Sequence, residues 1–419
     1  MQGFNLAEAS CGTACKALDC RSTLRIENIA QGCIPANISL HSEGSTQSMP
    51  DMNVTHKLEK ILRTAEKGSG LHNGDVRFLL DLEEKEHLEA LFATARNLRS
   101  RFFGRAVFLY GFLYISTYCR NNCHFCYYRK SNQESVRYRK DKGDIVSAAQ
   151  ELAQTGVHLI DLTMGEDPEL LDPKGQGGDW IIDVVCSVRA ATGLPMMVSP
   201  GLVPEEMLAR LANEGVNWYA CYQETHSREL FKQLRPGQSY DDRLKAKMMA
   251  HSVGMLIEEG LLAGVGESRD DIADSIDMMR RLDADQVRIM NFVPQVGTPM
   301  AAWSPPDPFR ELVVAAVMRL ALPDRLIPAS LDVDGLAGLK RRLDAGANVI
   351  TSLVPPGQGL AGVAQSSLDI EEGNRTAGSA IRILEENGLR IASLKEYTAW
   401  VQNRSQNATS VHTKQRSAC

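Results

Sequence analysis

Three cysteines lie on one short segment, Cys119-Arg-Asn-Asn-Cys123-His-Phe-Cys126, with three and then two residues between them. Thiolates are preferred ligands of iron–sulfur clusters, and close spacing on one loop lets three of them wrap a cube-shaped cluster. Three protein ligands leave one iron of a [4Fe-4S] cluster without a protein ligand. The segment therefore predicts a cluster with one coordination position free for chemistry.

Two other interpretations of these thiols are a zinc site and three unrelated buried cysteines. A structural zinc ion normally takes four Cys or His ligands, and His124 is badly placed beside Cys123 to complete such a set. A second run, Cys11, Cys15 and Cys20, has a spacing of three and then four residues in a polar context. We assign no cluster to this run and expect a solvated tail.

The overall composition excludes several classes of protein. The chain has 419 residues, 43% hydrophobic and 23% charged, which is typical of a globular protein with a large core. A net charge of -6 without a basic patch argues against nucleic-acid binding. The most apolar helical stretch, Leu312–Leu322, contains Arg319 and is too short to cross a bilayer. We expect a cytoplasmic protein with no membrane or nucleic-acid partner, in which cysteines are thiols or metal ligands.

The pattern along the chain indicates four segments. Residues 1–50 mix small polar residues without a sustained period and predict a poorly ordered N-terminal extension. Residues 51–105 carry leucines at roughly helical spacing and predict a helical lead-in. Residues 106–400 form the main folded domain, and residues 401–419 are expected to be a disordered tail.

The main domain contains short apolar runs that suit buried parallel strands, separated by segments long enough for helices. The runs are Val107–Ser116, His158–Met164, Pro195–Ser199, Asn217–Gln223, Gly260–Val265, Val287–Val293, Leu326–Leu331 and Asn348–Leu353. Helical segments between them include Lys142–Ala153, Pro204–Asn213, Asp270–Leu282 and Pro308–Leu320. This alternation predicts an α/β fold, a (β/α)8 TIM-type barrel.

Catalytic groups in such barrels gather at the carboxyl ends of the strands. The polar residues that follow or close the runs are Cys119, Gly165, Glu166, Glu224, Ser330 and Asp332. An ordinary turn explains a glycine such as Gly165 well, but it explains the charged residues less well. We therefore expect a functional rim at this end of the barrel.

The cluster segment resembles the cluster loop of the radical S-adenosylmethionine (SAM) superfamily, because an aromatic residue, Phe125, precedes the last cysteine directly after a strand. In that superfamily SAM chelates the open iron, accepts an electron and yields a 5'-deoxyadenosyl radical. The resemblance implies a [4Fe-4S] cluster and S-adenosyl-L-methionine as cofactors. It also implies an electron donor, such as a flavodoxin or ferredoxin, which the sequence does not identify.

A second set of residues is expected to hold SAM. The segment Met164-Gly165-Glu166 resembles the Gly-Gly-Glu-like segment of the superfamily, which contacts the methionyl amine. Glu224 is placed to accept hydrogen bonds from ribose hydroxyls, and Arg243 or Arg235 suits the methionyl carboxylate. Ordinary surface ion pairs are the alternative for these charged residues. The full expected set is Gly165, Glu166, Ser199, Glu224, Arg235 and Arg243.

A closer resemblance extends over roughly residues 75–396, to the methylornithine synthase family, whose members begin pyrrolysine biosynthesis. The matching stretches are Tyr114-Ile-Ser-Thr-Tyr-Cys119, Ile160-Asp-Leu-Thr-Met-Gly-Glu-Asp167, Leu234–Tyr240, Ile327-Pro-Ala-Ser-Leu-Asp332 and Ala345-Gly-Ala-Asn348. The resemblance implies an isomerase, a mutase that converts L-lysine to (3R)-3-methyl-D-ornithine. The radical takes hydrogen from a side-chain carbon of lysine, and the chain fragments into a glycyl radical and an aminobutene that recombine branched.

A site for lysine needs a cation for the carboxylate and anions or hydroxyls for the amines, away from water. Arg288 suits the first role, and Ser330 and Asp332 suit the second. Asp161 lies in an otherwise apolar run, and a buried charge requires a partner such as a substrate ammonium. Internal salt bridges that stabilise the barrel are the alternative for these residues.

Two other functions remain open from sequence. One is a different radical SAM enzyme of the biotin synthase or hydrogenase-maturase type, which predicts no lysine turnover. The other is a noncatalytic protein that binds a cluster without cleaving SAM.

Overall fold

The computed structural model describes residues 49–68, 70–172, 176–362, 364 and 375–416. The expected N-terminal extension lies outside these residues, apart from its last two positions, which begin a helix. Cys11, Cys15 and Cys20 lie outside the described residues as well.

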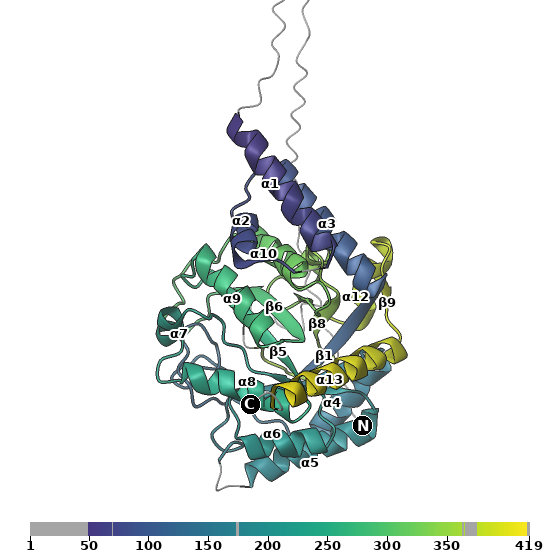
Figure 1. Cartoon of the computed structure of the whole chain (residues 1–419). Helices are drawn as coiled ribbons and strands as arrows, with labels where there is room; N and C mark the ends of the chain where they lie inside the picture. Colours follow the sequence, from purple (N-terminus) through teal and green to yellow (C-terminus); the bar gives the residue numbers. More distant parts are fainter. Residues whose placement is uncertain (1–48, 69, 173–175, 363, 365–374, 417–419) are drawn as a thin grey trace, which may run out of the picture. The chain divides into compact units, whose positions relative to one another are not determined.

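Parallel strands form the centre of the molecule, surrounded by helices (Figure 1). The strands are β1 (Ala106–Ser116), β2 (Leu159–Met164), β3 (Met196–Ser199), β4 (Trp218–Ala220), β5 (Leu256–Ala263), β6 (Gln286–Asn291), β7 (Pro328–Ser330) and β8 (Val349–Leu353). Their hydrogen-bonded order is β6-β5-β4-β3-β2-β1-β8-β7. Each strand thus lies beside the next one in sequence, β1 lies beside β8, and the two ends of this order are β6 and β7. Between β6 and β7, Val287 N donates to Leu326 O at 2.9 Å and closes the sheet. The predicted (β/α)8 barrel is confirmed.

The helices follow the chain order that the barrel requires. The crossover helices are α4 (Lys142–Gln154), α5 (Gly177–Thr192), α6 (Glu205–Asn213), α7 (Arg228–Leu234), α8 (Tyr240–Ser252), α9 (Arg269–Arg281), α10 (Pro308–Ala321) and α11 (Leu339–Asp344), the last preceded by the short helix η1 (Gly335–Gly338). Before the barrel come α1 (Met49–Glu66), α2 (Asn73–Leu80) and α3 (Lys85–Phe103), in the region where a helical lead-in was expected. None of the described helices is long and apolar enough to cross a bilayer.

Side chains of the strands alternate between the barrel interior and the helices, as the two-residue period of a strand requires. On β1, Phe112 and Tyr114 line the interior cavity, whereas Gly111 faces α4. A Cβ atom on Gly111 would lie 2.9 Å from Leu152 Cδ1, so the glycine lets α4 pack closely on the strand. The strand therefore presents its aromatic side chains to the cavity at its carboxyl end.

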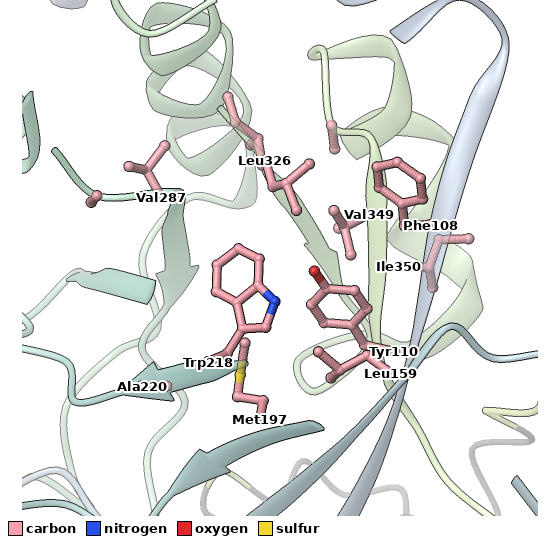
Figure 2. Packing of buried hydrophobic residues seen from close by; sticks show 14 of the residues in the cluster. Phe108, Tyr110, Leu159, Met197, Trp218, Ala220, Val287, Leu326, Val349 and Ile350 are labelled. Atoms are coloured by element: carbon pink, nitrogen blue, oxygen red, sulfur yellow. The ribbon is translucent and has the colours of Figure 1, made fainter. Parts of the chain in front are cut away.

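The interior at the other end of the barrel is filled by large side chains (Figure 2). Tyr110 and Trp218 face one another there, with Met197, Leu326 and Val349 around them. All five are fully buried. The barrel is a packed core below the cavity rather than a pore, as in other barrels of this size.

One strand begins earlier than the sequence predicts. The apolar run Gly260–Val265 was expected to be a strand, but β5 starts at Leu256 and includes Glu258 and Glu259. Both carboxylates are fully buried and paired, Glu258 with Arg288 of β6 at 2.7 Å and Glu259 with Lys247 of α8. Buried charges are tolerated when they are paired, so the acidic pair does not end the strand.

The C-terminal boundary also differs from the prediction. After α12 (Ala377–Glu386) and the short strand β9 (Arg390–Ile391), helix α13 spans Leu394–Arg416, so the predicted boundary at residue 400 falls within a helix. Trp400 stacks on Trp218 with ring centroids 5.9 Å apart. Arg404 Nε donates to Asp285 Oδ1 at 2.9 Å. These contacts hold α13, as far as Arg404, against the amino-terminal ends of the strands.

Candidate active site

An open cavity lies at the carboxyl ends of the strands. Its lining contains every residue that the sequence predicted for the site except Asp161 and Ser330, among the residues described. Each of these two residues is hydrogen-bonded to a residue of the lining. Asp161 accepts from Ser199 Oγ, and Ser330 Oγ donates to Asp332. The expected functional rim is thus one continuous cavity.

The three cysteines enter this cavity on the loop that follows β1. Cys123 is 5% exposed, and Cys119 and Cys126 are partly exposed. Burial raises the pKa of the Cys119 thiol to about 11, and burial also raises the pKa of Cys126. A positive partner such as iron would favour the thiolate forms of Cys119 and Cys126.

Gly165 has a packing role that the sequence did not reveal. It follows β2 directly below the cluster loop, and its N–H donates to Ser116 O at 3.0 Å. A Cβ atom on Gly165 would lie 2.2 Å from Tyr118 O and 2.9 Å from Cys119 Cβ. The absence of a side chain is what lets the first cysteine lie against β2.

Glu224 follows β4 and combines strain with an unused acceptor. Its φ of 68° is in the left-handed region, which non-glycine residues rarely adopt outside functional sites. Its Oε1 accepts a hydrogen bond from Arg235 Nη2 at 2.7 Å, while Oε2 is buried with no hydrogen-bond partner among the described residues. Burial raises the pKa of Glu224, against the opposing charges of Arg235 and Arg243. A buried acceptor without a partner suits a ligand hydroxyl.

Arg243 and Glu166 form a second network at the same wall. Arg243 Nη1 donates to Glu166 Oε1 at 3.0 Å, and Arg243 Nη2 donates to Tyr222 O at 2.8 Å. The other carboxylate oxygen of Glu166 accepts from Arg120 Nε at 3.2 Å. Burial raises the pKa of Glu166, but Arg243 and the Leu202 N–H outweigh it and hold the pKa below its usual value. Arg243 thus lines the cavity, and the carboxylate of Glu166 already compensates part of its positive charge.

Arg288 extends from β6 into the cavity lining. Its Nε donates to Glu258 Oε1 at 2.7 Å, and Tyr222 Oη donates to Glu258 Oε2 at 2.8 Å. The side chain is 1% exposed, and its Nη2 has no hydrogen-bond partner among the described residues. A buried guanidinium with a free donor is the arrangement that an incoming carboxylate would satisfy.

Asp161 lies nearby on β2, fully buried. Ser199 Oγ donates to its Oδ1 at 2.9 Å, so Ser199, which was expected in the SAM set, contacts a residue of the expected substrate set. Burial, together with the charge of Glu258, raises the pKa of Asp161 to about 7. Arg288 acts in the opposite direction.

Asp332 follows β7 and accepts hydrogen bonds from four groups. Oδ1 accepts from Tyr114 Oη at 3.1 Å and from Arg375 Nη1 at 2.9 Å. Oδ2 accepts from Ser330 Oγ at 3.1 Å and from Ser352 Oγ at 2.7 Å. Burial alone would raise the pKa of Asp332, but Arg375 and the hydroxyl donors lower it below its usual value. Asp332 is therefore held as a carboxylate at neutral pH.

Sequence reasoning missed several residues of the site, four of which contact the predicted substrate-binding residues. They are Tyr114, Glu258, Ser352 and Arg375. Glu258 was detectable as an acidic residue beside a predicted strand, and Tyr114 as a polar aromatic within one. Ser352, at a φ of 66°, and Arg375, from a distant segment, carry no such local signal.

The residues present fit a cluster and SAM. The donor set is three thiols on one loop at the cavity, and the buried Glu224 Oε2 beside them has no protein partner in the described chain. Within those same residues, no three His, Cys, Asp or Glu side chains are arranged to hold a single metal ion.

Known proteins resemble this chain in sequence and in fold. Residues 113–279 match the radical SAM superfamily. The 3-methylornithine synthase of Methanosarcina barkeri (strain Fusaro) is 42% identical over 333 residues, which are 80% of this chain and 94% of that protein. The crystal structure of a methylornithine synthase (PylB) superposes with a TM-score of 0.77 at 41% identity, covering 81% of this chain and 99% of that one.

A more distant relative is the [FeFe] hydrogenase maturase subunit HydE of Thermotoga maritima, 31% identical over 274 residues, 65% of this chain and 77% of that protein. The identity and coverage of the methylornithine synthases are higher throughout. The resemblance seen in the sequence is confirmed, and with it the radical SAM cofactors. The chain belongs to the 3-methylornithine synthase family of the radical SAM superfamily.

Proposed function

We propose that this chain is a radical SAM mutase that converts L-lysine to (3R)-3-methyl-D-ornithine for pyrrolysine biosynthesis. The observation that carries the proposal is the content of one cavity, with three thiols on its wall and the free Nη2 of the buried Arg288 among the same lining residues. The membership of the methylornithine synthase family supports the substrate.

The charges of the cavity match those of lysine. Lysine has one carboxylate and two ammonium groups, and the proposed substrate site has a free guanidinium donor on Arg288 and two buried carboxyl groups, Asp161 and Asp332, of which Asp332 is also paired with Arg375. In this proposal Arg288 binds the carboxylate, while Asp161, Asp332 and Ser330 lie near the amines. Each pairing replaces a hydration shell with fixed charges, which stabilises one orientation of the substrate.

Cys119, Cys123 and Cys126 would hold the cluster, and the bound cluster and SAM supply the radical that takes a hydrogen atom from lysine. Glu224 would accept hydrogen bonds from ribose hydroxyls through its free Oε2. Arg243 is the proposed partner of the methionyl carboxylate, and Gly165, Glu166, Ser199 and Arg235 support this side of the cavity. Their contacts position these groups before the cofactor arrives.

The protein must also confine the fragments of the substrate within the cavity. Substrate and product are isomers, so the hydrogen that is removed must return and neither carbon fragment can leave. Aromatic and thioether side chains, Phe112, Tyr114, Tyr222 and Met290, line the cavity beside the charged groups. Such a lining excludes water and protects a radical from side reactions.

The experiment that tests the proposal is anaerobic incubation of the reconstituted protein with SAM, dithionite and L-lysine. Chromatography with mass spectrometry would detect a new compound of the same mass as lysine, and the Cys123→Ala variant would lose it. Cleavage of SAM without any product from lysine would contradict the proposed substrate and favour an activity closer to that of the maturases or biotin synthases. A bound cluster without SAM cleavage would contradict catalysis altogether.

We further propose that a cytosolic flavodoxin or ferredoxin of low potential reduces the cluster. The described cysteines, including Cys186 and Cys221, are all free thiols, which suits a reducing compartment. Replacing dithionite with a reduced flavodoxin or ferredoxin in the same assay is the test. Turnover with dithionite but with neither protein donor would contradict the proposal.

A further inference from the structure

The three cysteines of the cluster loop do not have equivalent surroundings. Gln238 Nε2 donates a hydrogen bond to Cys123 Sγ at 3.0 Å, and Arg235 Nη1 donates to the same sulfur at 3.4 Å. Both donors lie on the segment after α7, to which the cluster loop is tied by His124 N donating to Leu234 O at 2.9 Å. Cys123 is therefore the cysteine whose sulfur has side-chain N–H donors placed beside it.

The contacts of Gln238 define which end of its amide faces the sulfur. Gln238 Oε1 lies 3.5 Å from Arg243 Nη1. A guanidinium only donates, so the amide oxygen belongs on the side of Arg243 and the NH2 group on the side of Cys123. Exchanging the two ends would place two sets of donors against each other. The buried and multiply bonded Arg243 thus orients the amide.

Arg235 shares its N–H donors among several acceptors, whereas Gln238 Nε2 donates to the Cys123 sulfur. Arg235 also pairs with Glu224 at 2.7 Å and donates to Tyr222 O at 3.2 Å, so its charge is compensated elsewhere. Gln238 is neutral and lies closer to the sulfur. A substitution of Gln238 therefore changes the hydrogen bond without removing an ion pair, which makes its effect interpretable.

We propose that Gln238 tunes the cluster, raising its reduction potential through the hydrogen bond to the Cys123 sulfur. Hydrogen bonds to the sulfurs are among the determinants of iron–sulfur potentials. The reduced cluster carries one more negative charge than the oxidised cluster, so an N–H donor stabilises the reduced form more. The inference rests on the part of the proposed function that places a [4Fe-4S] cluster on the three cysteines, and it is independent of lysine as substrate.

The test is an anaerobic redox titration of the reconstituted full chain, without SAM or lysine, followed by electron paramagnetic resonance of the reduced cluster. Gln238→Leu removes the donor, and Gln238→Glu keeps the size but replaces the donor with an anionic acceptor. We expect the midpoint potential to fall in Gln238→Leu and to fall further in Gln238→Glu. Gln133→Leu, at an exposed position later on the same loop, is the control and is expected to keep the wild-type potential.

Iron and sulfide contents show whether each variant holds a complete cluster. If Gln238→Leu does not, the comparison of Gln238→Glu with wild type decides the question. A wild-type midpoint potential in a fully loaded Gln238 variant would overturn the inference and would leave the proposed function intact. Absence of a cluster from the wild-type chain would instead count against the proposed function, so the two failures are distinguishable.

Discussion

At the scale of single residues, the two buried carboxyl groups near Arg288 are held in different protonation states. Asp332 accepts four hydrogen bonds, one of them from Arg375, and its pKa lies below the usual value. Asp161 has the hydroxyl of Ser199 as its donor but lies near the charge of Glu258, and burial raises its pKa to about 7. One carboxylate is permanently charged, while the other changes charge near neutral pH.

This difference predicts a pH dependence for lysine. A substrate ammonium pairs with the ionised form of Asp161, which is lost as pH falls through about 7. We expect kcat/KM for lysine to fall up to tenfold per pH unit below 7 and to level off above 8, because kcat/KM reports the free enzyme. Asp161→Asn should remove this step and lower kcat/KM at pH 8 by roughly 10- to 100-fold, the value of a hydrogen bond to a charged group. A flat wild-type profile between pH 6 and 8 would contradict the assignment.

Arg288 and Glu258 permit a test that separates binding from stability. In Arg288→Met the carboxylate of lysine loses its partner, so we expect KM to rise by roughly 10- to 100-fold. Glu258 is then left buried and unpaired, which should cost about 3–5 kcal/mol of stability. The double variant Arg288→Met/Glu258→Gln removes the orphaned charge, so it should regain stability in urea denaturation but not affinity for lysine. A wild-type KM in this folded double variant would show that Arg288 does not bind the substrate.

At the scale of elements, the cluster loop and β2 depend on one glycine. The backbone oxygen of Tyr118 occupies the place of a side chain on Gly165, and a backbone atom cannot rotate away as a side chain can. The two segments are therefore fixed against each other beside Cys119, the first of the proposed cluster ligands.

Gly165→Ala is expected to displace the cluster loop and to lose most of its iron after reconstitution, while circular dichroism stays that of a folded barrel. The control is Gly143→Ala at the start of α4, where an added Cβ atom meets nothing within 4 Å. Iron and sulfide per chain, measured for both variants, provide the comparison. Wild-type iron in Gly165→Ala would mean that the loop can shift without losing its ligands.

The strands show which parts of the fold can be predicted from the sequence and which cannot. Strands such as β1 and β2 are apolar runs between clear turns, so their places and the residues that follow them were predictable. The start of β5 was missed because Glu258 and Glu259 look like surface residues until Arg288 and Lys247 are seen to pair with them. Such pairing depends on tertiary structure, and local hydrophobicity does not record it.

The same limit applies to contacts made by distant segments. Arg375 reaches Asp332 across 43 positions of sequence, and Arg404 reaches Asp285 across 119. A polar helix such as α13 resembles a solvated tail in composition, because few of its side chains between residues 394 and 406 are buried. The three cysteines that we propose as cluster ligands could be singled out for the opposite reason, since their chemistry is contained in one loop.

At the scale of the whole barrel, the chemistry and the closure of the core lie at opposite ends of the strands. The cavity takes its lining from the carboxyl ends, whereas α13 packs on the amino-terminal ends through Tyr397, Trp400 and Arg404. Tyr397 Oη donates to Tyr110 Oη at 2.8 Å inside the barrel. Stability at the closed end can therefore be changed without touching the cavity.

Trp400→Ala tests this separation. It removes the ring that stacks on Trp218 and should destabilise the protein by about 2–3 kcal/mol, less than a fully buried tryptophan because Trp400 is only half-buried. We expect a lower urea midpoint, with iron content and KM for lysine unchanged at 25 °C. Lys395→Ala, exposed on the same helix, should change stability by no more than about 0.5 kcal/mol. A raised KM in folded Trp400→Ala would mean that the closed end is coupled to the cavity, since the packed layer of Tyr110 and Trp218 would then transmit the change.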